Sequence, residues 1–168
     1  DLSLDSESEI VFRPFFHLNS RYCIKDINFN KIKNLNIKKL FGYKDIIKKI
    51  NNKNQFSFQK KKFSRDLIDE FNLNTSLTYG RLIYSKQFSI SESIFLCNGQ
   101  INLIDDHPVL YFNCNIKSKD KKKLLENFSI NYKKRKEPMD LMVKGNLNIL
   151  NNKVNFDSIK MNNNYEAS

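Results

Sequence analysis

One short strand pattern recurs three times between residues 80 and 149 and limits the folds that the chain can adopt. Residues 80–84 (GRLIY), 99–103 (GQINL) and 145–149 (GNLNI) share a glycine followed by apolar residues at the third and fifth positions. Each is followed by a polar turn and another segment in which apolar residues alternate with polar ones. Alternation with a period of two is typical of strands that bury one face. Repetition of this unit predicts an elongated antiparallel sheet built of hairpins.

The glycines of the repeated unit, Gly80, Gly99 and Gly145, stand in the same phase as its apolar residues. In a strand, glycine marks a bend or a close approach of another group. We therefore expect the sheet to curl around its apolar face and to leave a concave groove that is open along its length. The candidate lining residues of this groove are Leu82, Tyr84, Ile101, Leu103, Leu147 and Ile149. The alternative is an ordinary core, because apolar alternation is first of all a folding signal.

Residues 75–168 are predicted to form an antiparallel β-meander with one short helix at about 119–128. Ser118 is the candidate N-cap of that helix. Asn151 and Asn152 indicate a two-residue hairpin turn, since asparagine tolerates the left-handed conformation. The alternation slips after Phe156, which predicts a β-bulge near residues 157–158.

Residues 1–74 are predicted to be a mixed strand and helix segment. Apolar residues recur at helical spacing between residues 37 and 50, which predicts a helical insertion within 30–52. A second short helix is expected after Ser64, with Leu67, Ile68 and Phe71 on its apolar side. The fold class is thus mainly β with short helices, in the α+β sense. We expect the chain to be an internal piece of a longer polypeptide, since Asp1 is not an initiator residue.

The net charge of +11 suggests nucleic-acid binding, because clustered Lys and Arg neutralise phosphates. The composition argues against that partner. Lys far outnumbers Arg, and Arg is the side chain suited to bidentate phosphate contacts. The abundance of Lys, Asn and Ile follows AT-rich codons, so we expect the Lys residues to be spread over the surface.

No catalytic, metal or cofactor motif stands out in the sequence. The Asp105-Asp106-His107-Pro108 run contains metal-ligand types, but Asp and Pro are ordinary turn formers, and we interpret it as a turn. No nucleotide-binding loop, nucleophile elbow or zinc-protease motif occurs. Cys97 and Cys114 fall on strands that can be neighbours, so a bridge is an open alternative, although free cysteines in the core are favoured. We predict no catalytic residue, metal site or cofactor.

Residues 75–168 resemble the C-terminal region of AsmA-like proteins, the group that includes AsmA, TamB and YhdP relatives. The likeness lies in three stretches: Gly99-Gln-Ile-Asn-Leu103, Pro108-Val-Leu-Tyr-Phe112, and residues 143–157 with their paired asparagines. The short helix after Ser118 fits the brief helical insertions between strands of that family.

The resemblance implies a non-enzymatic segment of a bacterial envelope protein that is anchored in the inner membrane and extends into the periplasm. Its implied role is phospholipid transfer between membranes, or outer-membrane assembly and homeostasis, through an apolar β-groove. The implied partners are phospholipid acyl chains, and the membrane through other parts of the parent chain. Two alternatives stay open: a basic nucleic-acid-binding or ribosome-associated protein, and a purely structural β module. The oligomeric state is not predicted.

Overall fold

The computed structural model describes residues 3–12, 16–26, 42–60, 67–133, 135–162 and 165–167. Within these residues the strands are β1 (Ser3–Val11), β2 (His17–Asp26), β3 (Asn51–Gln59), β4 (Glu70–Thr78), β5 (Arg81–Ile90), β6 (Ser93–Asn102), β7 (Val109–Ser118), β8 (Met139–Asn148), β9 (Lys153–Met161) and β10 (Tyr165–Ala167). Two short helices accompany them, α2 (Lys44–Ile47) and α3 (Lys121–Asn127). The chain is mainly β with short helices, as predicted.

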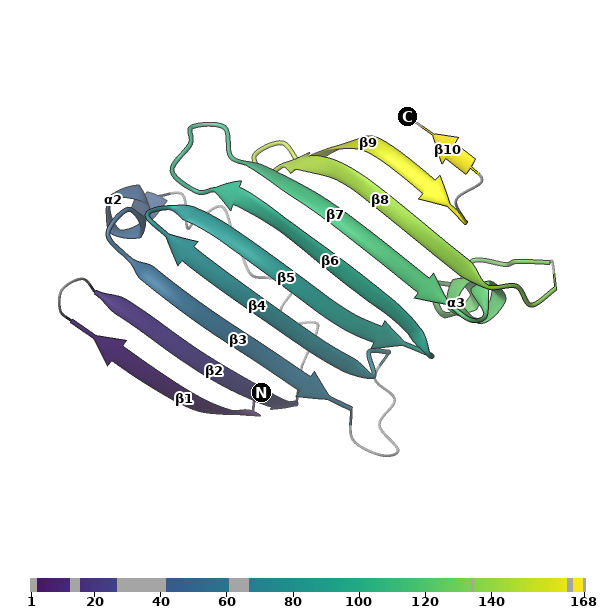
Figure 1. Ribbon diagram of the computed structural model, residues 1–168, viewed down its shortest axis with the longest axis horizontal. Helices are drawn as coiled ribbons and strands as arrows, with labels where there is room; N and C mark the ends of the chain where they lie inside the picture. The colour runs from purple at the N-terminus through teal and green to yellow at the C-terminus, as the bar shows by residue number, and fades with distance from the viewer. Residues whose placement is uncertain are drawn as a thin grey trace.

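All ten strands belong to one open sheet whose spatial order equals their order along the chain. The β2–β3 pair is parallel, and the other neighbours pair antiparallel. Figure 1 shows a single twisted layer, with α2 at one end of the strands and α3 at the other. The predicted antiparallel meander is confirmed, and the sheet also contains β1–β3 from the first part of the chain.

The sheet has two faces of opposite character, because each strand alternates and each register keeps apolar residues opposite apolar ones. In β6, Phe95, Cys97 and Ile101 are buried while Ile94, Asn98 and Gln100 are exposed. The ladder extends the first set into an apolar face across β1–β9. The second set extends into a polar face of Asn, Gln, Ser and charged residues.

The two helices each seal one end of the apolar face. Ile47 of α2 packs with Ile101 and Leu103 in one buried cluster. Leu124 of α3 packs with Ile90, Phe95 and Met139 in another. Burying a side chain of this size contributes about 1.5–3 kcal/mol, so each cluster fixes its helix to the sheet.

The bulge and the β8–β9 turn can be compared with their predictions from the sequence. Asp157 is an extra residue between the Lys144–Ser158 and Gly145–Phe156 pairs, so the bulge near 157–158 is confirmed. The two-residue turn at Asn151-Asn152 is wrong in length: β8 and β9 are joined by four residues, 149–152. Asn152 still has a left-handed φ of 58°.

The helices differ in detail from the predictions. Helix α3 lies within the predicted 119–128, but its N-cap is Asp120, whose carboxylate accepts a hydrogen bond from the Lys123 backbone N–H at 3.1 Å. The Ser118 hydroxyl instead accepts from the Asp120 N–H at 3.2 Å. The insertion predicted over 30–52 lies partly outside the described residues, and its last two residues begin β3. Phe71 lies in β4 rather than in a helix, because Phe58 and Phe88 pair with it on the apolar face.

Candidate apolar binding surface

Between its helix-covered ends the apolar face carries a central band, two rows of side chains that run across the strands. From β1 to β9, one row is Ser8, Ser20, Asn54, Thr75, Tyr84, Gly99, Phe112, Gly145 and Phe156, and the other is Ser6, Tyr22, Phe56, Leu73, Lys86, Cys97, Cys114, Val143 and Ile159. Among the described residues, α2 and α3 pack on either side of this band rather than over it. The band is therefore the candidate functional surface.

Two glycines of the band lie under aromatic rings from the neighbouring strand. A Cβ added to Gly99 would stand 2.7 Å from Cε1 of Tyr84 and 2.9 Å from its hydroxyl oxygen. A Cβ on Gly145 would stand 2.9 Å from Cζ of Phe112. These distances are well inside van der Waals contact, so atoms of both rings lie over positions that only glycine leaves open. The Phe112 and Phe156 rings meet edge to face, with their centroids 6.4 Å apart.

Gly80 does not belong to the band. It forms a two-residue hairpin turn with Tyr79 between β4 and β5, with φ values of 89° and 47° respectively. Both values are left-handed, as the tight turn that joins twisted strands requires. The sequence placed Gly80 within a strand because its phase matched, whereas the structure uses it for its backbone conformation.

The predicted lining residues share the apolar face, but the structure divides them between two surroundings. Ile101 and Leu103 are buried against Ile47 of α2, and Leu82 and Ile149 pack onto the same cluster. Leu147 is paired with Leu110, which also packs onto that cluster. Tyr84 alone of the six lies in the central band. The strand period places a residue on a face, but it does not say which part of the strand a helix covers.

The residues that the sequence did not single out are those at the middle of each strand. They include Lys86 and Leu73, the apolar side chains of Phe112, Val143, Phe156 and Ile159, and two cysteines. Phe156 is 55% exposed, the highest value in the apolar half of the band. The repeated glycines were the available signal, since Gly99 and Gly145 mark the middle of β6 and β8.

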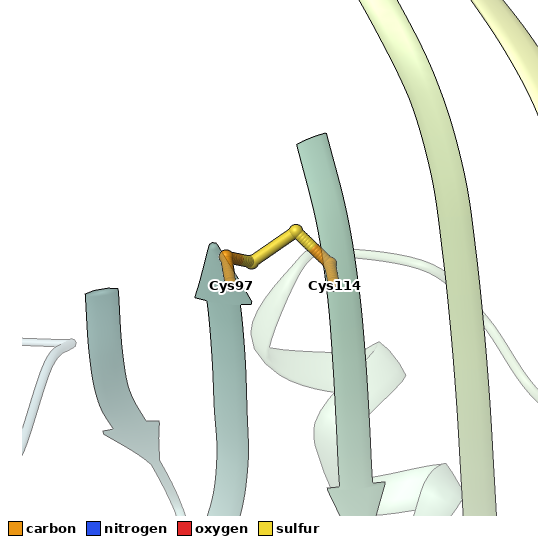
Figure 2. Close-up of a disulfide and its surroundings, with 2 residues drawn as sticks. All are labelled: Cys97 and Cys114. Carbon is orange, nitrogen blue, oxygen red and sulfur yellow. A yellow bond between two sulfur atoms is a disulfide. The ribbon is translucent and has the colours of Figure 1, made fainter. Parts of the chain in front are cut away.

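Cys97 and Cys114 form a disulfide across the band, which corrects the preference for free thiols. The two residues are directly paired on β6 and β7, and their Cα atoms are 4.1 Å apart. Figure 2 shows the bridge linking these neighbouring strands. Disulfides persist in oxidising compartments, so the bridge bears on where the chain works.

Lys86 is the only charged side chain in the two rows of the central band. It stands between Leu73 of β4 and Cys97 of β6, and its Nζ lies 5.3 Å from the centre of the Phe88 ring. Burial lowers the pKa of Lys86 below its usual value and raises the pKa of neighbouring Tyr84. Both shifts have the same cause, the loss of water around the charged form.

The opposite, polar face carries two hollows among the described residues. A hollow of about 790 Å³ extends from β1 to β6, with Gln55, Asn74 and Asn98 in its floor. A second hollow of about 430 Å³ adjoins it at Asn98 and continues to β9. The groove hypothesis placed the concave side on the apolar face. Carboxamides desolvated by an acyl chain would lose their hydrogen bonds to water, so these hollows do not suit lipid.

Basic and acidic side chains are interspersed over the described surface. Lys25 pairs with Asp5 at 2.7 Å at one edge of the sheet, and Lys44 pairs with Asp106 at 2.8 Å beside α2. Lys121 of α3 contacts Glu137 at 3.3 Å and lies over the Tyr132 ring at 4.8 Å. Asp106 belongs to the 105–108 run, which forms the β6–β7 connection as predicted.

Comparison with known proteins adds no relative to this geometry. No family model, curated protein or solved structure matches the chain. Within the described residues, no helix has the length and apolar character needed to cross a membrane, and no group of three or more His, Cys, Asp or Glu side chains could hold a metal ion. The chemistry of the central band is therefore the basis for a functional proposal.

Proposed function

We propose that this chain is a non-enzymatic, lipid-binding segment of an AsmA-like protein of the bacterial cell envelope. Its central band contacts phospholipid acyl chains during transfer between membranes or outer-membrane assembly. The observation that carries the proposal is the band itself: aromatic and aliphatic side chains in mid-sheet, bounded by a helix at either end of the strands. Contiguous apolar surface of this kind marks a site for apolar ligands or partners.

The disulfide supports a location on the periplasmic side of the inner membrane. Cys97 and Cys114 are oxidised, and the bacterial periplasm is an oxidising compartment whereas the cytosol is reducing. Nucleic-acid binding fits less well, because the ion pairs interleave acids with the basic side chains over the sheet and α3.

A charge placed in the band tests the proposal without disturbing the core. Phe156→Asp changes an apolar-face residue that is 55% exposed, and Ile83→Asp changes a polar-face residue that is 47% exposed. Both variants should fold, because neither carboxylate becomes buried. We expect Phe156→Asp to lose most of the phospholipid that co-purifies or photocrosslinks with the protein, and Ile83→Asp to keep it.

Thermal unfolding of both variants, followed by circular dichroism, provides the control for folding. Full lipid retention by a folded Phe156→Asp protein would contradict the proposal, as would equal loss from both variants. A charge at Leu103 answers a different question. Leu103 is buried against α2, so Leu103→Asp should unfold the sheet by leaving an unpaired charge in the core.

A further inference from the structure

One of the two rows of the central band changes from polar to apolar at β5, whereas the row that contains Lys86 has Tyr22, Phe56 and Leu73 on its β1–β4 side. On the β1–β4 side, the first row consists of hydroxyl and amide groups only, in which Ser8 donates to Ser20 at 3.0 Å and Asn54 donates to Thr75 at 3.4 Å. On the β6–β9 side the same row contains glycine and phenylalanine only. The boundary residues on β5 are Tyr84, which ends in a hydroxyl, and Lys86, which ends in an ammonium group.

No carboxylate among the described residues pairs with Lys86. Within the described residues the ammonium makes no ion pair, and its contact is the ring of Phe88. Burial is the cause of its lowered pKa, and no neighbouring charge contributes. A desolvated ammonium without a counterion is costly, whereas one paired with an oxyanion gains a charge-assisted hydrogen bond. An anionic group bound beside Lys86 would pair with this charge.

The β6–β9 half of the band is long enough to hold one acyl chain. Four strand spacings separate β5 from β9, or about 19 Å at ~4.8 Å per spacing. One leaflet of a bilayer has about 15 Å of hydrocarbon, half of the ~30 Å core. About 15 Å corresponds to about three strand spacings, so a chain that starts at Lys86 and runs over Phe112 would end near Val143 and Gly145 of β8.

We propose that the Lys86 ammonium binds the oxyanion headgroup of an amphiphile whose acyl chain lies over β6–β8. The ligand class is a phosphate- or carboxylate-bearing lipid, with its headgroup held on the sheet rather than left in water. Tyr84 is positioned to donate a second hydrogen bond, since its neutral hydroxyl lies over Gly99 beside Lys86. This inference rests on the proposed function and adds a fixed orientation to it.

The test compares twelve-carbon amphiphiles that differ only in their headgroups. Dodecyl phosphate and dodecanoate carry the two oxyanions, dodecyl maltoside is neutral, and dodecyltrimethylammonium is cationic. Binding to the full chain is measured by isothermal titration calorimetry below the concentration at which micelles form. We expect both anionic probes to bind about tenfold more tightly than the neutral one, as one charge-assisted contact predicts. The ratio of the two anionic affinities identifies the preferred oxyanion.

Three variants assign the preference to one side chain. Lys86→Met should reduce the preference for anionic over neutral probes to less than about threefold, because a single charge-assisted contact is lost. The affinity for the neutral probe should not change. Lys86→Arg should retain the preference for anionic probes. Lys144→Met removes a charge from the polar face of β8, directly between the band residues Val143 and Gly145, and should also retain the anionic preference. The pKa of Lys86, followed by NMR of its side chain, should rise when dodecyl phosphate binds, because the anion favours the charged form.

The outcomes separate this inference from the proposed function. Equal binding of anionic and neutral probes, or an anionic preference that survives Lys86→Met, would overturn the headgroup site and leave acyl-chain binding in place. Failure of every twelve-carbon probe to bind would overturn both. The orientation has its own measurement: a diazirine at the chain terminus of dodecanoate should crosslink to β8 and β9. Crosslinks confined to β1–β3 would overturn the proposed direction of the chain.

Discussion

Gly99 and Gly145 show how single residues shape the band. Each stands opposite an aromatic residue on the neighbouring strand, and the ring of that residue occupies the space where a side chain would be. Backbone atoms are also close, since the added Cβ atoms would lie 2.1 Å from the Tyr111 carbonyl oxygen and 2.3 Å from the Asn155 carbonyl oxygen. A methyl group at either position must move the backbone as well as the ring.

Replacing either glycine by alanine should therefore destabilise the protein. Gly99→Ala and Gly145→Ala should each lower the free energy of unfolding by about 1–3 kcal/mol, the usual cost of overpacking. Gly42→Ala is the matched control, because a Cβ there meets nothing within 4 Å. Urea titration of the three variants provides the measurement. Gly99→Ala as stable as Gly42→Ala would mean that the ring of Tyr84 does not hold its place over Gly99.

At the scale of elements, the hairpin turns place residues with side chains in the left-handed conformation that glycine prefers. The β5–β6 turn consists of Ser91 and Glu92, with φ values of 46° and 67°. The Asp69 carboxylate accepts a hydrogen bond from the Ser91 N–H at 2.8 Å, which helps to hold this turn. Left-handed backbone costs a residue with a side chain about 1–2 kcal/mol, and glycine avoids that cost.

Glu92→Gly should accordingly stabilise the chain. Glu92 also contacts Lys123 at 3.6 Å, but an exposed ion pair of this kind contributes little. Glu92→Ala removes the same ion pair and keeps the strained backbone, so it is the reference variant. We expect Glu92→Gly to be more stable than Glu92→Ala by about 1 kcal/mol in thermal unfolding. A difference of zero or of opposite sign would show that the turn tolerates a side chain at this position.

For the whole molecule, the disulfide ties together two strands in the middle of a single open layer. Cys97 and Cys114 are separated by 17 positions, and a loop of about 15 residues corresponds to about 3 kcal/mol of loop-closure entropy. The β6–β7 hairpin already restricts that loop. Replacing both cysteines by alanine should thus lower the free energy of unfolding by about 2 kcal/mol, while acyl-chain binding persists.

Mass spectrometry of the untreated protein gives an independent measurement of the bridge. Alkylation under denaturing conditions should label Cys23 and leave Cys97 and Cys114 unlabelled until a reductant is added. Labelling of all three cysteines without reductant would show that the bridge is absent, and the argument for an oxidising compartment would be lost.

The periodicity of the sequence was sufficient to predict the strands of the second half of the sheet and the face on which their apolar residues lie. Alternation around Leu110–Ile116 and Leu141–Ile149 identified β7 and β8, and the slip after Phe156 located the bulge. These signals are local, because the side-chain period of a strand depends only on its backbone geometry. Leu82, Tyr84, Ile101 and Leu147 share one face of the sheet for the same reason.

Only the tertiary structure decided which part of that face forms core and which part forms the central band. Ile101 and Lys86 lie on the same face, but α2 packs on the first and no described helix packs on the second. The cysteine bridge depends likewise on the register of β6 against β7, which pairs Cys97 directly with Cys114. Helix docking and strand register arise from contacts between segments distant in the chain, and a one-residue slip would undo either.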